Sequence, residues 1–320
     1  MSSASTTSLD WRFGGIPRSP GSQHSDSSLG MAVPDHASSE LNGLSELTQM
    51  EALFSKTMAR ARAAIRLQEE RTKSKQSAVE LFVPGRVCLF GEHSDWVGVM
   101  RRFNSTLQPG GCIVAGTNQG VFARCKPRAD GRLVFRSIRA DGTKTVLDVP
   151  MQVDSLRKLA EEGGFFSYVC GVACQVLQSY DVGGIQIDNY KTTLADGKGL
   201  SSSAAVCVLV ARAFNQSYAL KITPRGEMEL AYQGEISTPS RCGRMDQCVA
   251  FGRAPVRMRF DGDCVDASPL SVGGPIHMVV VDLAAGKDTT AILQGLGRSF
   301  PFPESETDQV RFHIMRNARI

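Results

Sequence analysis

A loop rich in glycine and hydroxyl groups is the first candidate for chemistry in this sequence. It reads Ala-Asp-Gly-Lys-Gly-Leu-Ser-Ser-Ser-Ala-Ala over residues 195–205 and runs into an apolar, helix-compatible stretch over 206–214. Glycines let the backbone approach a ligand closely, and the first-turn N–H groups of a helix lack internal partners and carry the positive end of its dipole. This arrangement predicts a polyphosphate site, with Mg²⁺ held by hard oxygen ligands. The alternative is an ordinary turn followed by an N-cap.

A second polar cluster ends an apolar strand candidate. Residues 85–96 read Gly-Arg-Val-Cys-Leu-Phe-Gly-Glu-His-Ser-Asp-Trp. The carboxylate and imidazole groups of Glu92, His93 and Asp95 can bind neighbouring hydroxyls of a polyol, and Trp96 can lie against its apolar face. The alternative is a solvated, charged turn. A metal site is less favoured, because the cluster offers few nitrogen ligands.

A third segment, over 234–247, joins the end of a helix candidate to an isolated acidic residue. Glu235 closes the helix, and Asp246 follows in otherwise uncharged surroundings. Asp246 is therefore a candidate general base for a hydroxyl, most effective beside a cation such as Arg86. It is also a candidate N-cap for a helix over 247–251.

The elements that must position these segments are strands first, and then helices interleaved with strands. Short apolar runs between glycine turns indicate the strands, and longer apolar spacing indicates the helices. This order predicts an α+β arrangement. The predicted strands cover 79–83, 112–116, 121–125, 133–136, 145–149, 184–193 and 278–282, and the helices cover 165–180, 203–220 and 228–235.

The first 76 residues differ in composition from the rest. Residues 1–40 are rich in Ser, Gly and Pro. We expect a disordered tail there, because such a segment buries too little surface to offset its chain entropy; a transit peptide is the less favoured alternative. Residues 41–76 carry Leu and Met at helical spacing with a basic end, which predicts an amphipathic helix that packs on the domain over 79–290. Contact with a membrane or an acidic partner is the alternative.

Composition argues against several classes of protein. The 320 residues carry a net charge of +4 without a basic cluster, so no nucleic-acid partner is indicated. No apolar run reaches the roughly 18 residues that cross a membrane, so no membrane partner is expected. The nine cysteines form no C-x-x-C pair, and their odd number favours reduced thiols in the cytoplasm over disulfides or structural zinc. The oligomeric state is left open.

In this order, the three segments resemble the GHMP kinases, and among them the galactokinase-like sugar kinases. Residues 85–96 resemble the signature G-R-x-N-L-I-G-E-H-x-D-Y, and residues 195–204 resemble the loop P-x-G-x-G-L-S-S-S-A with alanine in place of proline. Residues 243–247 are similar to the segment G-x-M-D-Q. The resemblance implies an ATP- and Mg²⁺-dependent kinase for a hydroxyl of a monosaccharide or sugar acid. It also implies the α+β fold of a GHMP kinase N-terminal domain, which is like domain 2 of ribosomal protein S5.

The resemblance further implies roles for single residues. Arg86 would stabilise the transferring phosphoryl group, and Asp246 would accept or orient the proton of the sugar hydroxyl. Ser203 and Glu235 would bind Mg²⁺. The sugar's other hydroxyls would be bound by Glu92, His93 and Asp95, and the ATP phosphates by Gly197, Gly199, Leu200, Ser201, Ser202 and Ser203.

The sequence departs from the family pattern in two places. Cys88, Phe90 and Trp96 replace the family's Asn, Ile and Tyr. We expect these changes to line the sugar end of the site, so the sugar's identity stays open. The family's late glycine-rich loop is absent, and we expect residues 291–320 to be the truncated start of a C-terminal region whose domain is missing or truncated. A non-catalytic sugar or nucleotide sensor on this fold is therefore the second hypothesis, and a scaffold that binds a partner through its N-terminal helix is the third.

Overall fold

The computed structural model describes residues 58, 78–138, 142–194, 199–240, 242–274 and 289–315. The chain divides into two units, Met1–Arg62 and Ala63–Ile320, and every helix and strand below belongs to the second. Three predicted elements lie outside the described residues. They are the tail over 1–40, the helix over 41–76 (Met58 apart) and the strand over 278–282.

A seven-stranded sheet carries the fold, in the order β4-β3-β5-β2-β6-β7, with β1 paired to β2. Neighbours are antiparallel except β3 and β5, which run parallel. The strands in chain order are β1 (Val79–Phe90), β2 (Gly110–Arg128), β3 (Arg132–Ile138), β4 (Lys144–Pro150), β5 (Gly184–Thr192), β6 (Val256–Asp261) and β7 (Cys264–Pro269).

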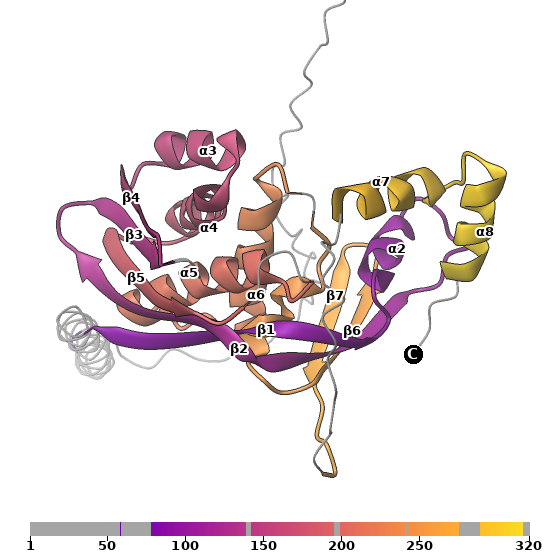
Figure 1. Ribbon diagram of the computed structural model, residues 1–320, viewed down its shortest axis with the longest axis horizontal. Coiled ribbons are helices and arrows are strands. Elements are labelled where there is room, and N and C mark those ends of the chain that lie inside the picture. Colours follow the sequence, from indigo (N-terminus) through magenta and orange to yellow (C-terminus); the bar gives the residue numbers. More distant parts are fainter. Residues whose placement is uncertain are drawn as a thin grey trace, which may run out of the picture. The chain divides into compact units, whose positions relative to one another are not determined.

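The helices form two groups at the two ends of the long strands (Figure 1). One group, α3 to α6, covers a single face of the sheet, and the other, α2 with α7 and α8, gathers at the far end of β1 and β2. The helices are α2 (Ser94–Met100), α3 (Val153–Glu162), α4 (Phe165–Ser179), α5 (Ser202–Tyr218), α6 (Pro224–Ile236), the 3-10 helix η1 (Asp246–Phe251), α7 (Thr289–Ser299) and α8 (Glu306–Met315).

Each helical group has its own apolar core. Along β1, alternate residues such as Leu81 and Val83 are buried, and they join a core that includes almost every residue of α5 from Ala205 to Phe214. A helix that is apolar all round requires burial on all sides, which α4, α6 and the sheet supply. The smaller core lies between α2, α7 and α8 and consists of Val97, Leu107, Leu296, Phe300 and Phe312.

Several predicted boundaries were wrong. The strand predicted over 79–83 continues through Pro84 to Phe90, and the strands predicted over 112–116 and 121–125 are one strand, β2. Their pairing shifts register between Pro84, opposite Gly120, and Arg86, opposite Gly116, so the extra residues of β2 form a bulge. The polar residues between the two predicted strands therefore interrupt the ladder without ending it.

Other elements were not predicted at all. In the segment interpreted as a possible charged turn after Phe90, Glu92 and His93 do form a turn, but the short helix α2 begins directly after it at Ser94. The elements α3, β6, β7, α7 and α8 were absent from the expectation. The remaining predicted strands and helices correspond to β3, β4, β5, α4, α5 and α6.

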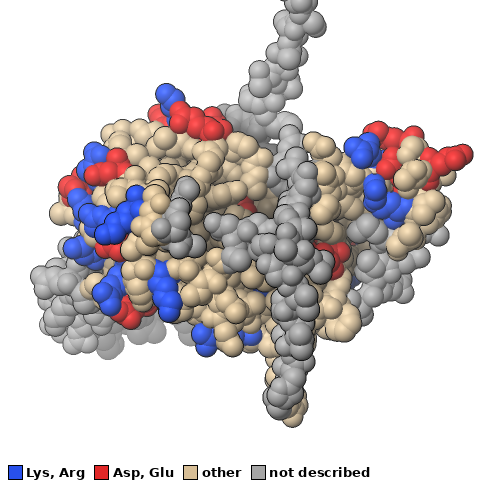
Figure 2. Space-filling view, in the orientation of Figure 1, with Lys and Arg blue, Asp and Glu red and all other residues tan. Residues whose placement is uncertain are grey.

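The charged surface consists largely of local pairs. Figure 2 shows basic and acidic side chains side by side over the end that carries β3 and β4. Arg132 Nε lies 2.6 Å from Asp148 Oδ1 there, and Arg136 Nη1 lies 3.0 Å from Asp188 Oδ1. Separately, none of the described helices has the length and apolar character required to cross a bilayer.

Candidate active site

The three sequence segments meet around one cavity of about 1260 Å³. Gly197 lies outside the described residues. Every other residue selected from the sequence lines this cavity, namely Arg86, Glu92, His93, Asp95, Gly199, Leu200, Ser201, Ser202, Ser203, Glu235 and Asp246.

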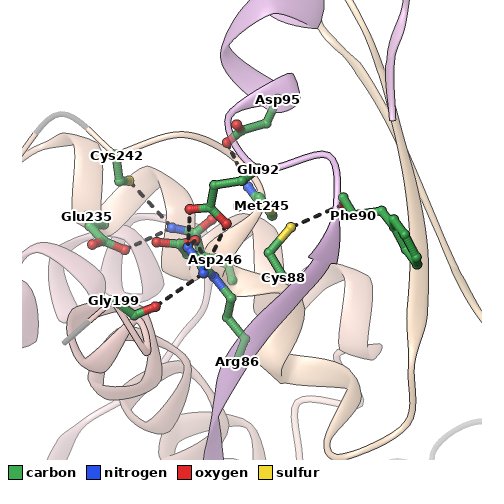
Figure 3. Close-up of polar contacts among 11 residues, drawn as sticks. Arg86, Cys88, Phe90, Glu92, Asp95, Gly199, Glu235, Cys242, Met245 and Asp246 are labelled. Atoms are coloured by element: carbon green, nitrogen blue, oxygen red, sulfur yellow. Dashed lines mark hydrogen bonds and ion pairs between the residues drawn. The ribbon is translucent and has the colours of Figure 1, made fainter. Parts of the chain in front are cut away.

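Arg86 lies at the centre of the polar contacts (Figure 3). It comes from β1 and is only 6% exposed. Its Nε and Nη2 donate to Asp246 Oδ1 at 2.9 and 2.6 Å, and its Nη1 donates to the carbonyl oxygen of Gly199 at 3.2 Å. Glu92 completes the cluster, with its two carboxylate oxygens 3.4 Å from the Arg86 Nη atoms. One guanidinium thus joins the strand, the hydroxyl-rich loop and the acidic segment.

The neighbouring carboxylates of Asp246 and Glu92 stabilise the positive charge of Arg86. Burial alone would lower the pKa of Arg86, but the charges of Asp246 and Glu92, together with the hydrogen bond to Asp246, outweigh it and raise that pKa. The partner carboxylates stay more open, with 25% of the Asp246 side chain and 35% of the Glu92 side chain exposed. The cluster is therefore accessible from its carboxylate side.

The hydroxyl-rich loop adopts a backbone that few residues tolerate. Gly199 has φ 74° and Ser201 has φ 58°, in the left-handed region where a non-glycine residue is uncommon. Ser201 directly precedes α5, so Ser202 and Ser203 form its first turn. The Ser201 Oγ is buried and has no hydrogen-bond partner among the described residues. A buried unpaired hydroxyl at a helix N-terminus is a group that a bound phosphate oxygen can satisfy.

Glu235 and Ser203 are adjacent, and their chemistry fits a magnesium ion. Glu235 is 1% exposed, and burial raises its pKa to about 7 despite hydrogen bonds from Ser203 and Gln247. The Gln247 Nε2 donates to Glu235 Oε2 at 2.8 Å. Mg²⁺ takes one or two protein oxygens and completes its octahedron with phosphate oxygens and water, which matches a lone carboxylate beside a hydroxyl. No larger cluster of His, Cys, Asp or Glu suited to a metal occurs in the described part of the chain.

Asp95 is held against the acidic segment by a close backbone contact. Its Oδ2 accepts a hydrogen bond from the Met245 N–H at 3.2 Å. A Cβ added to Gly243 would overlap the same oxygen, so only glycine allows this approach. Burial, followed by the negative charge of Asp246, raises the pKa of Asp95 to about 6. Asp95 lines the cavity together with His93 and Trp96.

Of Cys88, Phe90 and Trp96, which replace the family's residues and were all expected to line the sugar end of the site, only one does line the cavity. Trp96 lines the cavity, whereas Cys88 and Phe90 are not among its lining residues. The Cys88 Sγ donates to the carbonyl oxygen of Phe90 at 3.2 Å, and Phe90 is 62% exposed. Alternation along β1 would place both side chains on the same face as Arg86, but the pairing of β1 with β2 shifts register between Cys88 and Phe90, at the end of the strand. Only one of the three departures therefore alters the cavity wall.

Other residues of the site were not identified from the sequence. Gln247 does not line the cavity but donates to Glu235, and its place next to Asp246 in a matched segment was the available signal for this role. The rest come from elements without a motif, such as Tyr168 on α4, Asn189 on β5 and Gln294 on α7. No local pattern marks them, because only the fold brings them to the cavity.

Comparison with known proteins agrees with this geometry. Residues 167–253 match the family model described as GHMP kinases N terminal domain. The match includes Glu235 and Asp246 and excludes Arg86. A galactokinase of Clostridium tetani is 27% identical over 205 residues, which are 62% of this chain and 48% of the relative. A galactokinase of Thermotoga petrophila is 26% identical over 176 residues, which are 53% of this chain and 43% of the relative.

Solved structures show the same fold. Lactococcus lactis galactokinase complexed with galactose aligns with a TM-score of 0.51 at 17% identity, over 74% of this chain and 60% of that one. Methanococcus jannaschii mevalonate kinase aligns with a TM-score of 0.51 at 13% identity, over 76% of this chain and 71% of that one. The α+β fold expected from the sequence is confirmed. Part of the chain, residues 167–253, matches the GHMP kinase N-terminal domain, and the chain is similar to galactokinases over about half of their length.

Proposed function

We propose that this protein transfers the terminal phosphoryl group of ATP to a hydroxyl of a neutral monosaccharide. The observation that supports this most directly is the contact of Arg86 with both Asp246 and the backbone of the hydroxyl-rich loop. A general base and a phosphate-binding loop must lie on opposite sides of the transferred group, and Arg86 lies between them. The similarity to galactokinases supports the same class of reaction.

The residues have complementary roles in this reaction. The hydroxyl oxygen of the sugar forms a bond to the γ-phosphorus while the bond from that phosphorus to the β–γ bridging oxygen breaks, and ADP leaves with the bonding electrons. Asp246 takes the hydroxyl proton. Both Arg86 bonds go to Asp246 Oδ1, so we assign Oδ2 as the proton acceptor. Positioning and charge neutralisation supply the rate, because phosphoryl transfer needs little covalent help from the protein.

The loop and Glu235 hold the nucleotide in this proposal. Gly199 to Ser203 surround the phosphates, and the buried Ser201 hydroxyl gains a partner, which it does not have among the described residues. Ser203 and Glu235 would hold Mg²⁺, which would offset the negative charge of the phosphates. Because Glu235 has its pKa raised to about 7, metal binding there is coupled to loss of its proton.

The charge of the acceptor end favours a neutral sugar over a sugar acid. Glu92, Asp95 and Asp246 line this end, and the guanidinium of Arg86 is already bonded to two of them. A carboxylate on the substrate would face like charges in a partly desolvated cavity, which is unfavourable. Hydroxyls, in contrast, can donate to all three carboxylates.

The free thiols of all nine cysteines support a reducing, cytoplasmic setting for the reaction.

The test is an assay for phosphorylated product with ATP, Mg²⁺ and matched pairs of neutral sugars and their uronic acids. We expect product from at least one neutral sugar, detected by mass spectrometry, and none when Asp246→Asn replaces the wild type. Tight sugar binding without product in the wild type would contradict the kinase and favour the sensor hypothesis. Product from the uronic acids alone would contradict the charge argument.

A further inference from the structure

A second arginine, Arg212, lies outside the cavity and binds three separate elements. It comes from α5, and its Nε and Nη2 donate to Glu227 Oε2 at 2.9 and 2.7 Å. The Nη2 also donates to the carbonyl oxygen of Ala250 at 2.6 Å, and the Nη1 donates to that of Phe82 at 3.4 Å. None of these four residues lines the cavity.

Each partner belongs to an element that carries a residue of the candidate site. Phe82 lies on β1, four residues before Arg86, and Ala250 lies on η1, four residues after Asp246. Glu227 lies on α6, which ends beside Glu235, and Arg212 itself lies on the helix that begins at the hydroxyl-rich loop. A single guanidinium therefore connects the four backbones that position the site.

We propose that Arg212 is a positioning residue that sets the distance between Arg86 and Asp246. This proposal rests on the proposed function for its effect on rate. Its geometric part stands without that function. The planar guanidinium fixes several donors in one geometry, so the carbonyls of β1 and η1 cannot shift independently. Displacing a reacting group by about 1 Å can reduce rate about 10²-fold, even when the substituted residue is remote.

Arg212 is built for this role by burial and by its partners. Its side chain is 18% exposed and that of Glu227 is 5% exposed, so the pair is poorly screened by solvent. Asn215 Nδ2 donates to the other Glu227 oxygen, Oε1, at 2.7 Å, which fixes the carboxylate. A lysine would keep the charge but could not donate to a carboxylate and two carbonyls in the same plane.

The experiment compares two variants at Arg212 with a matched control. Arg212→Lys keeps the charge opposite Glu227, and Arg212→Met combined with Glu227→Gln removes both charges, so that neither variant leaves a bare buried ion. The control is Arg225→Met on α6, because Arg225 also binds a carboxylate and a backbone carbonyl, Asp266 Oδ1 at 3.0 Å and the Ala267 oxygen at 2.6 Å. Those partners lie on β7, away from the site.

The readout independent of activity is the Arg86 Nε–H signal in nitrogen-15 NMR of the full chain, assigned by its loss in Arg86→Lys. This N–H donates to Asp246 at 2.9 Å, so its hydrogen exchange reports on that contact. We expect exchange at least about tenfold faster in both Arg212 variants, the equivalent of about 1.4 kcal/mol, and no change in Arg225→Met. Equal exchange in all variants, or equal acceleration in the control, would overturn the proposal.

Turnover provides the second readout. We expect kcat to fall about 10²-fold in the Arg212 variants while KM for ATP and sugar changes little, because the binding groups remain. A rise in KM alone, with kcat unchanged, would also overturn the proposal. If the wild type shows no phosphoryl transfer but the Arg86 signal responds as expected, the positioning role stands and the proposed function fails.

Discussion

Two arginine clusters, one around Arg86 and one around Arg212, differ in how open their carboxylates are. Arg86 is 6% exposed, but its partner Asp246 keeps a quarter of its side chain exposed. Arg212 binds Glu227, whose side chain is 5% exposed and bonded on both oxygens. One cluster can accept a further partner from the cavity, and the other is complete within the fold. The exposure of the carboxylate therefore distinguishes an arginine–carboxylate pair that can bind a ligand from one that only stabilises the fold.

The largest effect is expected from a substitution in the cluster around Arg86, whose carboxylates are partly exposed. Asp246→Asn should lower kcat about 10²- to 10⁴-fold, the range for loss of a general base, because the amide cannot take the hydroxyl proton. Steady-state kinetics measures this effect, and calorimetry should show ATP binding nearly unchanged. An equal loss of ATP affinity would assign Asp246 to the nucleotide instead.

The next largest effect is expected from a substitution in the cluster around Arg212, whose carboxylate is buried. Glu227→Gln should reduce the free energy of unfolding by about 3 kcal/mol, because it leaves the Arg212 charge without its counterion. Urea denaturation measures the change, with Asp246→Asn as the comparison. The contrast between the clusters fails if Asp246→Asn proves equally destabilising.

A third prediction concerns the contact between Gly243 and Asp95. Gly243→Ala should move the Asp95 carboxylate, because the new Cβ would overlap Oδ2. Overpacking of this kind costs about 1–3 kcal/mol, so sugar affinity should fall about tenfold or more while ATP affinity is retained. Titration of each ligand by calorimetry tests this. Equal sugar affinity in the variant would separate Asp95 from sugar binding.

The smallest expected effect depends on pH. Glu235 has its pKa raised to about 7, so it is increasingly protonated below that value. Affinity for Mg·ATP should fall up to about tenfold per pH unit below 7, relative to Glu235→Gln, which retains only the pH dependence of ATP itself. The free energy of unfolding changes with pH in the opposite direction to that expected for a salt-bridged carboxylate, whose pKa is lowered. The folded chain binds the proton more tightly than the unfolded chain does, so stability falls as pH rises from about 4.5 to 7. Glu235→Gln should reduce that slope and leave the part that comes from Asp95, whose pKa is also raised, to about 6.

The sequence predicted the segments around the cavity better than the elements between them. The hydroxyl-rich loop and the segment around Asp246 carry local signals, because glycine and hydroxyl residues at fixed spacing are needed where a backbone bends or approaches another group. The fold class and the helices α4 and α5 followed from apolar spacing. Their convergence in one cavity could be expected only from the resemblance to a family.

What could not be predicted depended on tertiary contacts. The residues after Thr117 look like a turn, yet β2 continues because β1 pairs with it on both sides of a bulge. The polar residues of α2 suggest a solvated turn, but Ser94 and Asp95 are buried by contacts with Gly111 and Met245. The role proposed for Arg212 and the position of Gln294 in the cavity wall depend on elements far away in the chain, which no local pattern specifies.

The protein also contains its own optical probe. Trp96 is one of two tryptophans, it lines the cavity, and its indole N–H has no hydrogen-bond partner among the described residues. Indole emission responds to the polarity and hydrogen bonding of its surroundings. With Trp11 replaced by phenylalanine, fluorescence of the single remaining indole would therefore follow the arrival of a ligand in real time, without a label.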